Sequence, residues 1–376
     1  MNKISSLMIN SISSIQIPMS LQCQLRCKYC YIRDNNYKII PVDYDSIFKV
    51  MQSAVEFFKI TSKETSAIIP WGAEPLCNWQ NIEKSLRYAF TQYPGFVQTA
   101  WSTNGLIAPT KYLDFINEFI DRIIYVQISL DGPEEVHDYS RVHRDGSGSF
   151  RQVMKTVETM YNKCPNLGNK LIFKATLSPE QLTLHHFYKS VHFFLTEMKL
   201  PLDPTSLVMD TPYSPEAIKA LKEDLDRLKE EWSEIKAINK DATIGLFYKL
   251  ENHQNPYCSA CSTQVEVDLD GNFYPCHAPV TANNIKKYFC LGNVFTKIVN
   301  DKAIYRTLYG KYNANLIRSP LCNSCCVNTI NPTFCYICFT DSLISTHNVS
   351  FFPLSTCKVK QVIGNSFLEW KNDNIL

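Results

Sequence analysis

Three cysteines in one short loop constrain this chain more than any other feature. Cys23, Cys27 and Cys30 lie within eight residues, directly after a short apolar segment. Three thiolates at this spacing can hold one iron–sulfur cube, but cluster ligation normally uses four cysteines, so one iron would lack a protein ligand. A metal with an open coordination position is typical of a site that does chemistry. The alternatives are three unrelated thiols or part of a zinc site completed from elsewhere.

The other cysteines also cluster. Of 15 cysteines in 376 residues, three lie in this loop and ten between Cys258 and Cys357, which leaves Cys77 and Cys164 isolated. The sequence has no visible signal peptide and no long apolar run, so we expect a cytoplasmic protein with reduced thiols and no membrane partner. The clustering then favours metal sites over disulfides. A net charge of +2 gives no electrostatic reason to expect nucleic-acid binding.

Strand and helix patterns alternate over the first 210 residues or so. Apolar segments predict strands at residues 14–20, 66–71, 97–103, 123–130, 171–177 and 206–209. Helical periodicity predicts helices at residues 47–60, 80–93, 111–121, 150–162 and 184–198. Such an alternation is typical of parallel βαβ units, which form an open sheet or a barrel. A further helix at 216–239, capped by Ser214, reads as a structural linker with one apolar face.

Polar or glycine-rich segments follow four of these strands. They are the cysteine loop and residues 72–75, 102–105 and 129–133. Chemistry in parallel α/β folds collects in the loops after the carboxyl ends of the strands. The four segments are therefore expected to form one site.

The cysteine loop, with the aromatic Tyr29 before its last cysteine, resembles the signature of the radical S-adenosylmethionine (SAM) enzymes. The resemblance implies a partial (β/α)6 TIM-type barrel and a [4Fe-4S] cluster on Cys23, Cys27 and Cys30, with SAM at the open iron. Enzymes of this kind cleave SAM and use the 5′-deoxyadenosyl radical to abstract hydrogen. They take one electron from an external donor such as flavodoxin or ferredoxin.

The resemblance also implies a set of SAM contacts. The segment Gly72, Ala73, Glu74 resembles the family's GGEP motif with alanine in the second position, and Glu74 would accept the SAM ammonium group. Glu74 could instead be only a helix-start carboxylate beside Pro75. The SAM carboxylate would meet Ser129 and Arg141, for which Arg144 could substitute. The remaining predicted contacts are Ser102 and Asn104 on the ribose side, which could be local caps, and Tyr29 and Leu177 near adenine.

The cysteine-rich end resembles the SPASM extension of this family. Residues 265–274 are expected to form a β-hairpin around Asp270 and Gly271. Family connectivity implies two auxiliary [4Fe-4S] clusters. Their predicted ligands are Cys258, Cys261, Cys276 and Cys338 for the first, and Cys322, Cys325, Cys335 and Cys357 for the second. Cys326 could replace Cys335, Cys290 has no assigned role, and paired cysteines of this kind also build zinc sites.

The resemblance implies three regions and one activity. They are a radical SAM barrel over residues 1–212, a helical linker over 213–255 and a SPASM domain over 256–376. The expected activity is hydrogen abstraction from a ribosomally made precursor peptide, to form a side-chain crosslink. Formylglycine formation, as in anaerobic sulfatase maturases, and epimerisation are alternatives, as is a non-catalytic metal-stapled binding protein. Asp131 and His277 are the catalytic candidates. His277 stands where the maturases place an aspartate base.

Overall fold

The structure is a computed structural model in which most of the chain can be described. The described residues are 2–30, 32, 42–63, 66–94, 97–208, 211–252, 259–281, 286–316, 322, 325–331 and 354–375. The chain divides into two compact units. The first comprises Met1–Ser129, Arg141–Phe173 and Ser259–Tyr309, and the second comprises Leu130–Ser140, Lys174–Cys258 and Gly310–Leu376. The domain boundaries at residues 212 and 255 stay a prediction.

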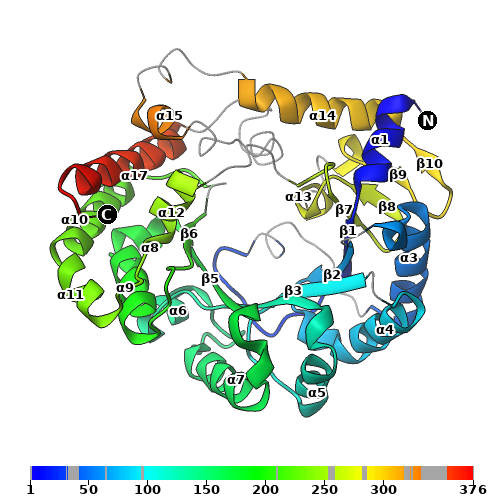
Figure 1. Cartoon of the computed structure of the whole chain (residues 1–376), viewed down its shortest axis with the longest axis horizontal. Helices are drawn as coiled ribbons and strands as arrows, with labels where there is room; N and C mark the ends of the chain where they lie inside the picture. The colour runs from blue at the N-terminus through cyan, green and yellow to red at the C-terminus, as the bar shows by residue number, and fades with distance from the viewer. Residues whose placement is uncertain are drawn as a thin grey trace. The chain divides into compact units, whose positions relative to one another are not determined.

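A largely parallel sheet forms the first unit (Figure 1). Its parallel strands are β1 (Ser14–Ser20), β2 (Ser66–Gly72), β3 (Val97–Thr103), β4 (Ile123–Ser129) and β7 (Gln264–Val267). The antiparallel strands β8 (Asn272–Tyr274), β9 (Gly292–Asn293) and β10 (Ile298–Val299) extend one edge, and the order is β10-β9-β8-β7-β1-β2-β3-β4. The predicted hairpin is thus confirmed as β7 and β8, and β7 also pairs in parallel with β1.

Helices follow the strands of this sheet as predicted. They are α1 (Lys3–Ser11), α3 (Tyr44–Phe57), η2 (Pro75–Asn78), α4 (Trp79–Gln92), α5 (Thr110–Glu118), α7 (Phe150–Lys163) and α13 (His277–Thr281), with short 3-10 turns η1 (Ile60–Ser62), η3 (Ile120–Arg122), η4 (Pro165–Lys170) and η6 (Lys286–Tyr288). Asp43 begins α3 because its carboxylate accepts the Ser46 N–H at 2.9 Å. In Figure 1, α3, α4 and α5 lie along one side of β1, β2 and β3.

The core of the first unit fills the space between the sheet and these helices. Trp101 of β3 contacts Trp79 of α4 and Tyr112 of α5, with ring centroids 5.6 and 6.0 Å away. Because side chains alternate along a strand, Gln98, Ala100 and Ser102 point to the opposite face. We call this the inner face of the sheet, the face turned away from α4 and α5.

The second unit is mainly helical. Strand β5 (Leu171–Leu177) begins in the first unit, and its second half pairs with β6 (Thr205–Leu207). The helices are α6 (Glu134–Ser140), α8 (Pro179–Thr183), α9 (His186–His192), a π-helical turn η5 (Phe193–Glu197), α10 (Pro215–Glu230), α11 (Trp232–Ile238), α12 (Gly245–Asn252), α15 (Cys326–Ile330) and α17 (Leu354–Asn372). Helix α14 (Asp301–Leu316) crosses the boundary between the two units.

The predicted long helix is present but interrupted. Ser214 caps α10 by accepting the Ala217 N–H at 3.2 Å, as expected. The helix breaks at Glu231, which separates α10 from α11 and whose carboxylate accepts the Tyr188 hydroxyl at 2.6 Å. The predicted apolar face of this segment packs in one hydrophobic cluster with α17. In the part of the chain that the structure describes, no helix has both the length and the apolarity needed to span a membrane.

Candidate functional site

The cysteine loop leaves the end of β1 and is fixed against the segment after Arg141. The Arg26 N–H donates to the Val142 carbonyl at 2.8 Å, and Leu25 forms an antiparallel bridge with His143. The Arg141 guanidinium lies 5.4 Å from the Tyr29 ring centroid. The residues predicted for the cluster and for the SAM carboxylate are therefore brought together within the first unit.

Hydrogen-bond donors point at the first cysteine sulfur. Cys23 Sγ accepts the Leu25 N–H at 3.4 Å and the Asn104 side-chain amide at 3.7 Å. Burial, and next the Glu74 charge, raise the pKa of the Cys23 thiol to about 12. A thiolate here therefore needs a positive partner, and N–H donors to sulfur are what an iron-bound thiolate uses. This donor set fits an iron–sulfur cluster.

No metal site is fully gathered among the described residues. Within those ranges, no group of three or more Cys, His, Asp or Glu side chains is close enough to hold a metal ion. Cys23, Cys27 and Cys30 are all partly exposed. Ligation of a cluster by this loop remains a prediction.

Glu74 joins the loops that follow β2 and β3. Its carboxylate accepts the Leu76 N–H at 3.0 Å and the Thr103 hydroxyl at 2.8 Å through Oε1, and the Asn104 N–H at 2.6 Å through Oε2. The residue is 1% exposed. Glu74 therefore also has the alternative role of a carboxylate at a helix start, because it caps η2. A carboxylate accepts about four hydrogen bonds, so one position is left for a ligand ammonium.

Burial of Glu74 has a consequence for stability. Burial raises the pKa of this carboxyl from 4.5 to about 7, although its three hydrogen bonds and Arg141 act in the opposite direction. The folded apoprotein therefore holds a proton that the unfolded chain loses between pH 4.5 and 7. The free energy of unfolding should therefore fall by about 3 kcal/mol as the pH rises through this window. Urea unfolding at several pH values measures this dependence. In the Glu74→Gln variant the free energy of unfolding should change little with pH, whereas the Glu83→Gln variant should keep the dependence of the wild-type protein.

Gly72 allows the ends of β1 and β2 to approach closely. Its φ is +128°, and a Cβ at this position would lie 1.8 Å from the Ser20 carbonyl oxygen. The next residue, Ala73, has no positive φ, and its N–H donates to the same oxygen at 2.8 Å. The alanine that departs from the family motif is therefore accommodated without strain.

The remaining predicted contacts of the first unit lie at strand ends. Asn104 donates from Nδ2 to Gln24 Oε1 at 3.1 Å, and its Oδ1 accepts the Leu106 N–H at 3.0 Å. Ser102 accepts a hydrogen bond from Gln127 at 2.9 Å on the inner face. Ser129 is the last residue of β4 and is partly buried.

Leu177 and Asp131 belong to the second unit, and there they make structural contacts. Leu177 is fully buried in the hydrophobic cluster formed with α8, α9 and α10. Its contact with adenine stays a prediction. Asp131 accepts the Thr176 N–H at 3.0 Å and is fully buried, which favours a structural link over a catalytic role.

Cys77, which the sequence left isolated, lies near this site. Burial and the Glu74 charge raise the pKa of its thiol to about 11, and Cys77 also raises the pKa of Cys23. No spacing motif includes Cys77, so only the turn η2 after Glu74 places it there.

The C-terminal cysteines are only partly described. Cys258, Cys335 and Cys338 lie outside the described residues. In the second unit, burial and the charges of Cys322 and Cys325 raise the pKa of Cys357, and Gln361 donates to Cys325 Sγ at 3.8 Å. Cys322, Cys325 and Cys357 therefore interact electrostatically. Ligation of a second auxiliary cluster by these residues stays a prediction. Cys261 and Cys276 lie in the first unit, before β7 and after β8.

The fold and the cysteine loop define a class of protein. Residues 17–175 match the radical SAM superfamily, so the chain contains a radical SAM domain. Proteins of this superfamily use a [4Fe-4S] cluster and SAM. The predicted recognition of this part of the chain is confirmed.

The relatives include sulfatase maturases and a radical SAM cyclopropyl synthase. A cysteine-type anaerobic sulfatase-maturating enzyme of Clostridium novyi is 23% identical over 344 residues, which covers 87% of this chain and 90% of the relative. The radical SAM cyclopropyl synthase TigE of Paramaledivibacter caminithermalis is 27% identical over 182 residues, 44% of this chain and 36% of the relative.

Solved structures share the fold. Native anSMEcpe with bound AdoMet, which is SAM, aligns with a TM-score of 0.69 at 18% identity and covers 96% of this chain and 100% of that chain. The same protein with AdoMet and a Cp18Cys peptide aligns with a TM-score of 0.66 at 18% identity, covering 96% and 99%. The predicted α/β fold of the partial TIM-barrel type is therefore confirmed.

Proposed function

We propose that this protein is a radical SAM enzyme that abstracts a hydrogen atom from a residue of a peptide. Cys23, Cys27 and Cys30 would hold a [4Fe-4S] cluster with one open iron, and the cluster together with SAM would supply the radical chemistry. The observation that carries the proposal is the connected set of loops formed by Cys23, Glu74, Asn104 and Arg141. Their hydrogen bonds and contacts bring the predicted cluster, ammonium and carboxylate contacts to the same ends of β1 to β4.

Each of these residues has a defined task in the proposal. Cys23, Cys27 and Cys30 hold the cluster, and Asn104 orients Cys23 through its side-chain amide. Glu74 holds the loops and accepts the SAM ammonium group with its remaining acceptor position. Arg141, only 8% exposed, meets the SAM carboxylate because a guanidinium offers paired donors to two oxygens. Gly72 and Ser20 fix the turn that places Glu74.

Peptides are the substrate class that the relatives support. The sulfatase-maturase structures include complexes with peptides, and such maturases match most of this chain. We favour a side-chain crosslink, in line with the cyclopropyl synthase relative. Formylglycine formation is the second candidate, favoured by the greater coverage of the maturases, although His277 replaces their aspartate. The cysteines around 258–357 would then hold two auxiliary clusters, and a flavodoxin or ferredoxin would supply the electron.

Mass spectrometry of a co-expressed candidate peptide distinguishes these outcomes. A crosslink removes two hydrogens from the peptide, epimerisation leaves the mass unchanged, and formylglycine replaces the cysteine sulfur by an aldehyde oxygen. We expect the loss of two hydrogens with wild-type protein and an unmodified peptide with the Cys23→Ala, Cys27→Ala, Cys30→Ala variant. The same product mass with both proteins would reject the proposed activity.

A further inference from the structure

The side chain of Asn104 is held in one orientation against the first cysteine sulfur. Its Nδ2 donates to Cys23 Sγ at 3.7 Å and to Gln24 Oε1 at 3.1 Å, while its Oδ1 accepts the Leu106 N–H at 3.0 Å. A side-chain amide has two N–H donors, so both are used here. Because Oδ1 faces a backbone N–H, the flipped orientation of the amide is excluded. Asn104 is 7% exposed, so these protein contacts fix its geometry.

Asn104 also contacts the carboxylate of the same site. Its backbone N–H donates to Glu74 Oε2 at 2.6 Å. Burial, and next the charge of Glu74, raise the pKa of the Cys23 thiol to about 12, so an ionised carboxylate and a thiolate disfavour each other here. Asn104 donates one N–H to each of these two groups. It therefore offsets part of their repulsion by charge-assisted hydrogen bonds.

Reduction would add further negative charge at this position. It transfers one electron from the external donor to a cluster on the cysteine loop, and the thiolate sulfurs then become better hydrogen-bond acceptors. N–H donors to these sulfurs stabilise the reduced form more than the oxidised form, and so raise the reduction potential. Cys23 Sγ accepts one such donor from the Leu25 backbone at 3.4 Å and one from the Asn104 side chain. Of these two donors, the second can be removed by substitution.

We propose that Asn104 raises the reduction potential of the cluster by donating its side-chain amide to the Cys23 thiolate. It thereby sets how readily the external donor supplies the electron. Placing a cluster on Cys23 rests on the proposed function. The role of Asn104 rests on the hydrogen bonds that fix its amide against the sulfur.

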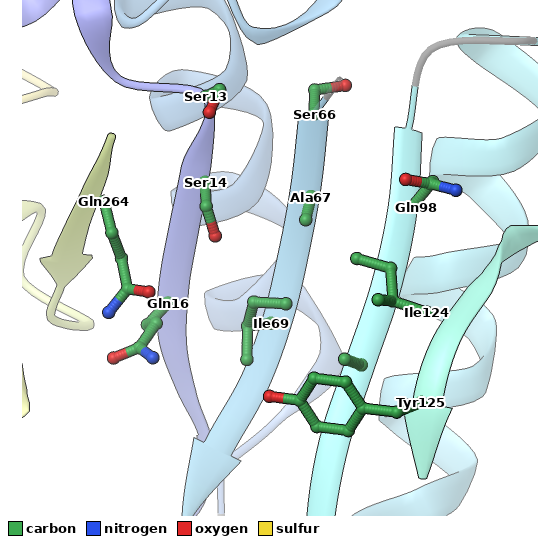
Figure 2. A pocket seen from close by; sticks show the side chains of 11 residues that line it. Ser13, Ser14, Gln16, Ser66, Ala67, Ile69, Gln98, Ile124, Tyr125 and Gln264 are labelled. Atoms are coloured by element: carbon green, nitrogen blue, oxygen red, sulfur yellow. The ribbon is translucent and has the colours of Figure 1, made fainter. Parts of the chain in front are cut away.

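An amide at the other end of the same strand provides the matched control. Gln98 is the second residue of β3 and Asn104 directly follows its last residue, so about 20 Å of extended chain separates them. Figure 2 shows Gln98 at a hollow on the inner face of the sheet, whose lining residues are all uncharged. An amide-to-acid substitution at Gln98 therefore adds the same charge to the same strand, far from the cysteine loop.

The reduction potential of the reconstituted protein without SAM tests the proposal. Electron paramagnetic resonance measures the reduced cluster at a series of fixed solution potentials. In Asn104→Ala, the ratio of reduced to oxidised cluster at a given potential should fall about tenfold, because a hydrogen bond to a charged group is lost. This equals a potential about 59 mV lower for a one-electron couple. Asn104→Asp keeps the shape but replaces the donor by an acidic oxygen, so its ratio should fall at least as far.

Gln98→Glu should leave this ratio within about twofold of the wild-type value, since its charge is distant from the sulfurs. A wild-type potential in Asn104→Ala would overturn the proposal. An equal decrease in Asn104→Asp and Gln98→Glu would also overturn it, because the effect would then be one of charge in general. Iron analysis of each variant distinguishes a lower potential from loss of the cluster.

A second measurement does not depend on a folded variant. The wild-type protein is labelled with ¹⁵N in its asparagine side chains, and pulsed electron paramagnetic resonance of the reduced cluster should detect a coupled ¹⁵N nucleus. Absence of this coupling contradicts the proposal. Reductant-dependent release of 5′-deoxyadenosine is measured on the same preparation. Cleavage of SAM without the ¹⁵N coupling rejects only the role of Asn104, and the coupling without cleavage of SAM rejects only the proposed function.

Discussion

Replacing Cys23, Cys27 and Cys30 together by alanine is expected to remove about four iron atoms per chain and to reduce 5′-deoxyadenosine release to background. The reason is that, among the described residues of the first unit, no other loop offers three thiols, and this loop is fixed by contacts with both Asn104 and Arg141. Iron and sulfide analysis after anaerobic reconstitution measures the first effect. Chromatography of the reaction mixture measures the second.

Cys164→Ala is the matched control for this variant. Cys164 is a buried thiol of the first unit whose Sγ donates to the Leu113 carbonyl at 3.7 Å, away from the cysteine loop. The Cys164→Ala variant should keep its iron and its activity. Full iron content and SAM cleavage in the triple variant would show that the loop is not the cluster site.

Gly72→Ala is expected to destabilise the first unit by about 4 kcal/mol or more. The new Cβ would meet the Ser20 carbonyl oxygen at 1.8 Å, where the contact is with backbone and cannot rotate away. Because β1 and β2 carry the cysteine loop and Glu74 from these ends, cluster binding should be lost as well. Chemical denaturation and iron analysis measure the two effects.

Gly146→Ala isolates the effect of close packing from that of the backbone angle. Gly146 also has a positive φ, of +86°, but an added Cβ there has no atom within 4 Å. The Gly146→Ala substitution should lower the free energy of unfolding by only about 1 kcal/mol. If both substitutions have the same small effect, the close approach of β1 and β2 does not constrain the site.

The strands could be predicted because their apolar runs end at clear turns. The observed bounds of β1, β3 and β5 equal the predicted ranges, and the loops after β1, β2 and β3 do converge. The parallel pairing of β7 with β1 could not be predicted, since it joins distant parts of the chain. The hydrogen bond from Trp71 of β2 to Glu266 of β7 could not be predicted either, because the two residues are 195 positions apart in sequence.

Residue roles were harder to predict than positions. The resemblance gave Leu177 a place beside adenine, whereas its burial in the hydrophobic cluster of the second unit became visible only in the structure. Glu74 was expected to bind a ligand or to cap a helix, and the structure gives it the cap together with two further hydrogen bonds. Period-2 alternation along residues 14–20 and 264–267 was the available signal for the polar inner face.

Reductant-dependent cleavage of SAM by the wild-type protein tests the central claim most directly. Protein reconstituted with iron and sulfide without oxygen, then mixed with dithionite and SAM, is predicted to release 5′-deoxyadenosine and methionine in equal amounts. Without dithionite, no release is expected. A preparation that holds its iron but leaves SAM intact under these conditions would contradict the assignment of this fold and cysteine loop to radical SAM chemistry.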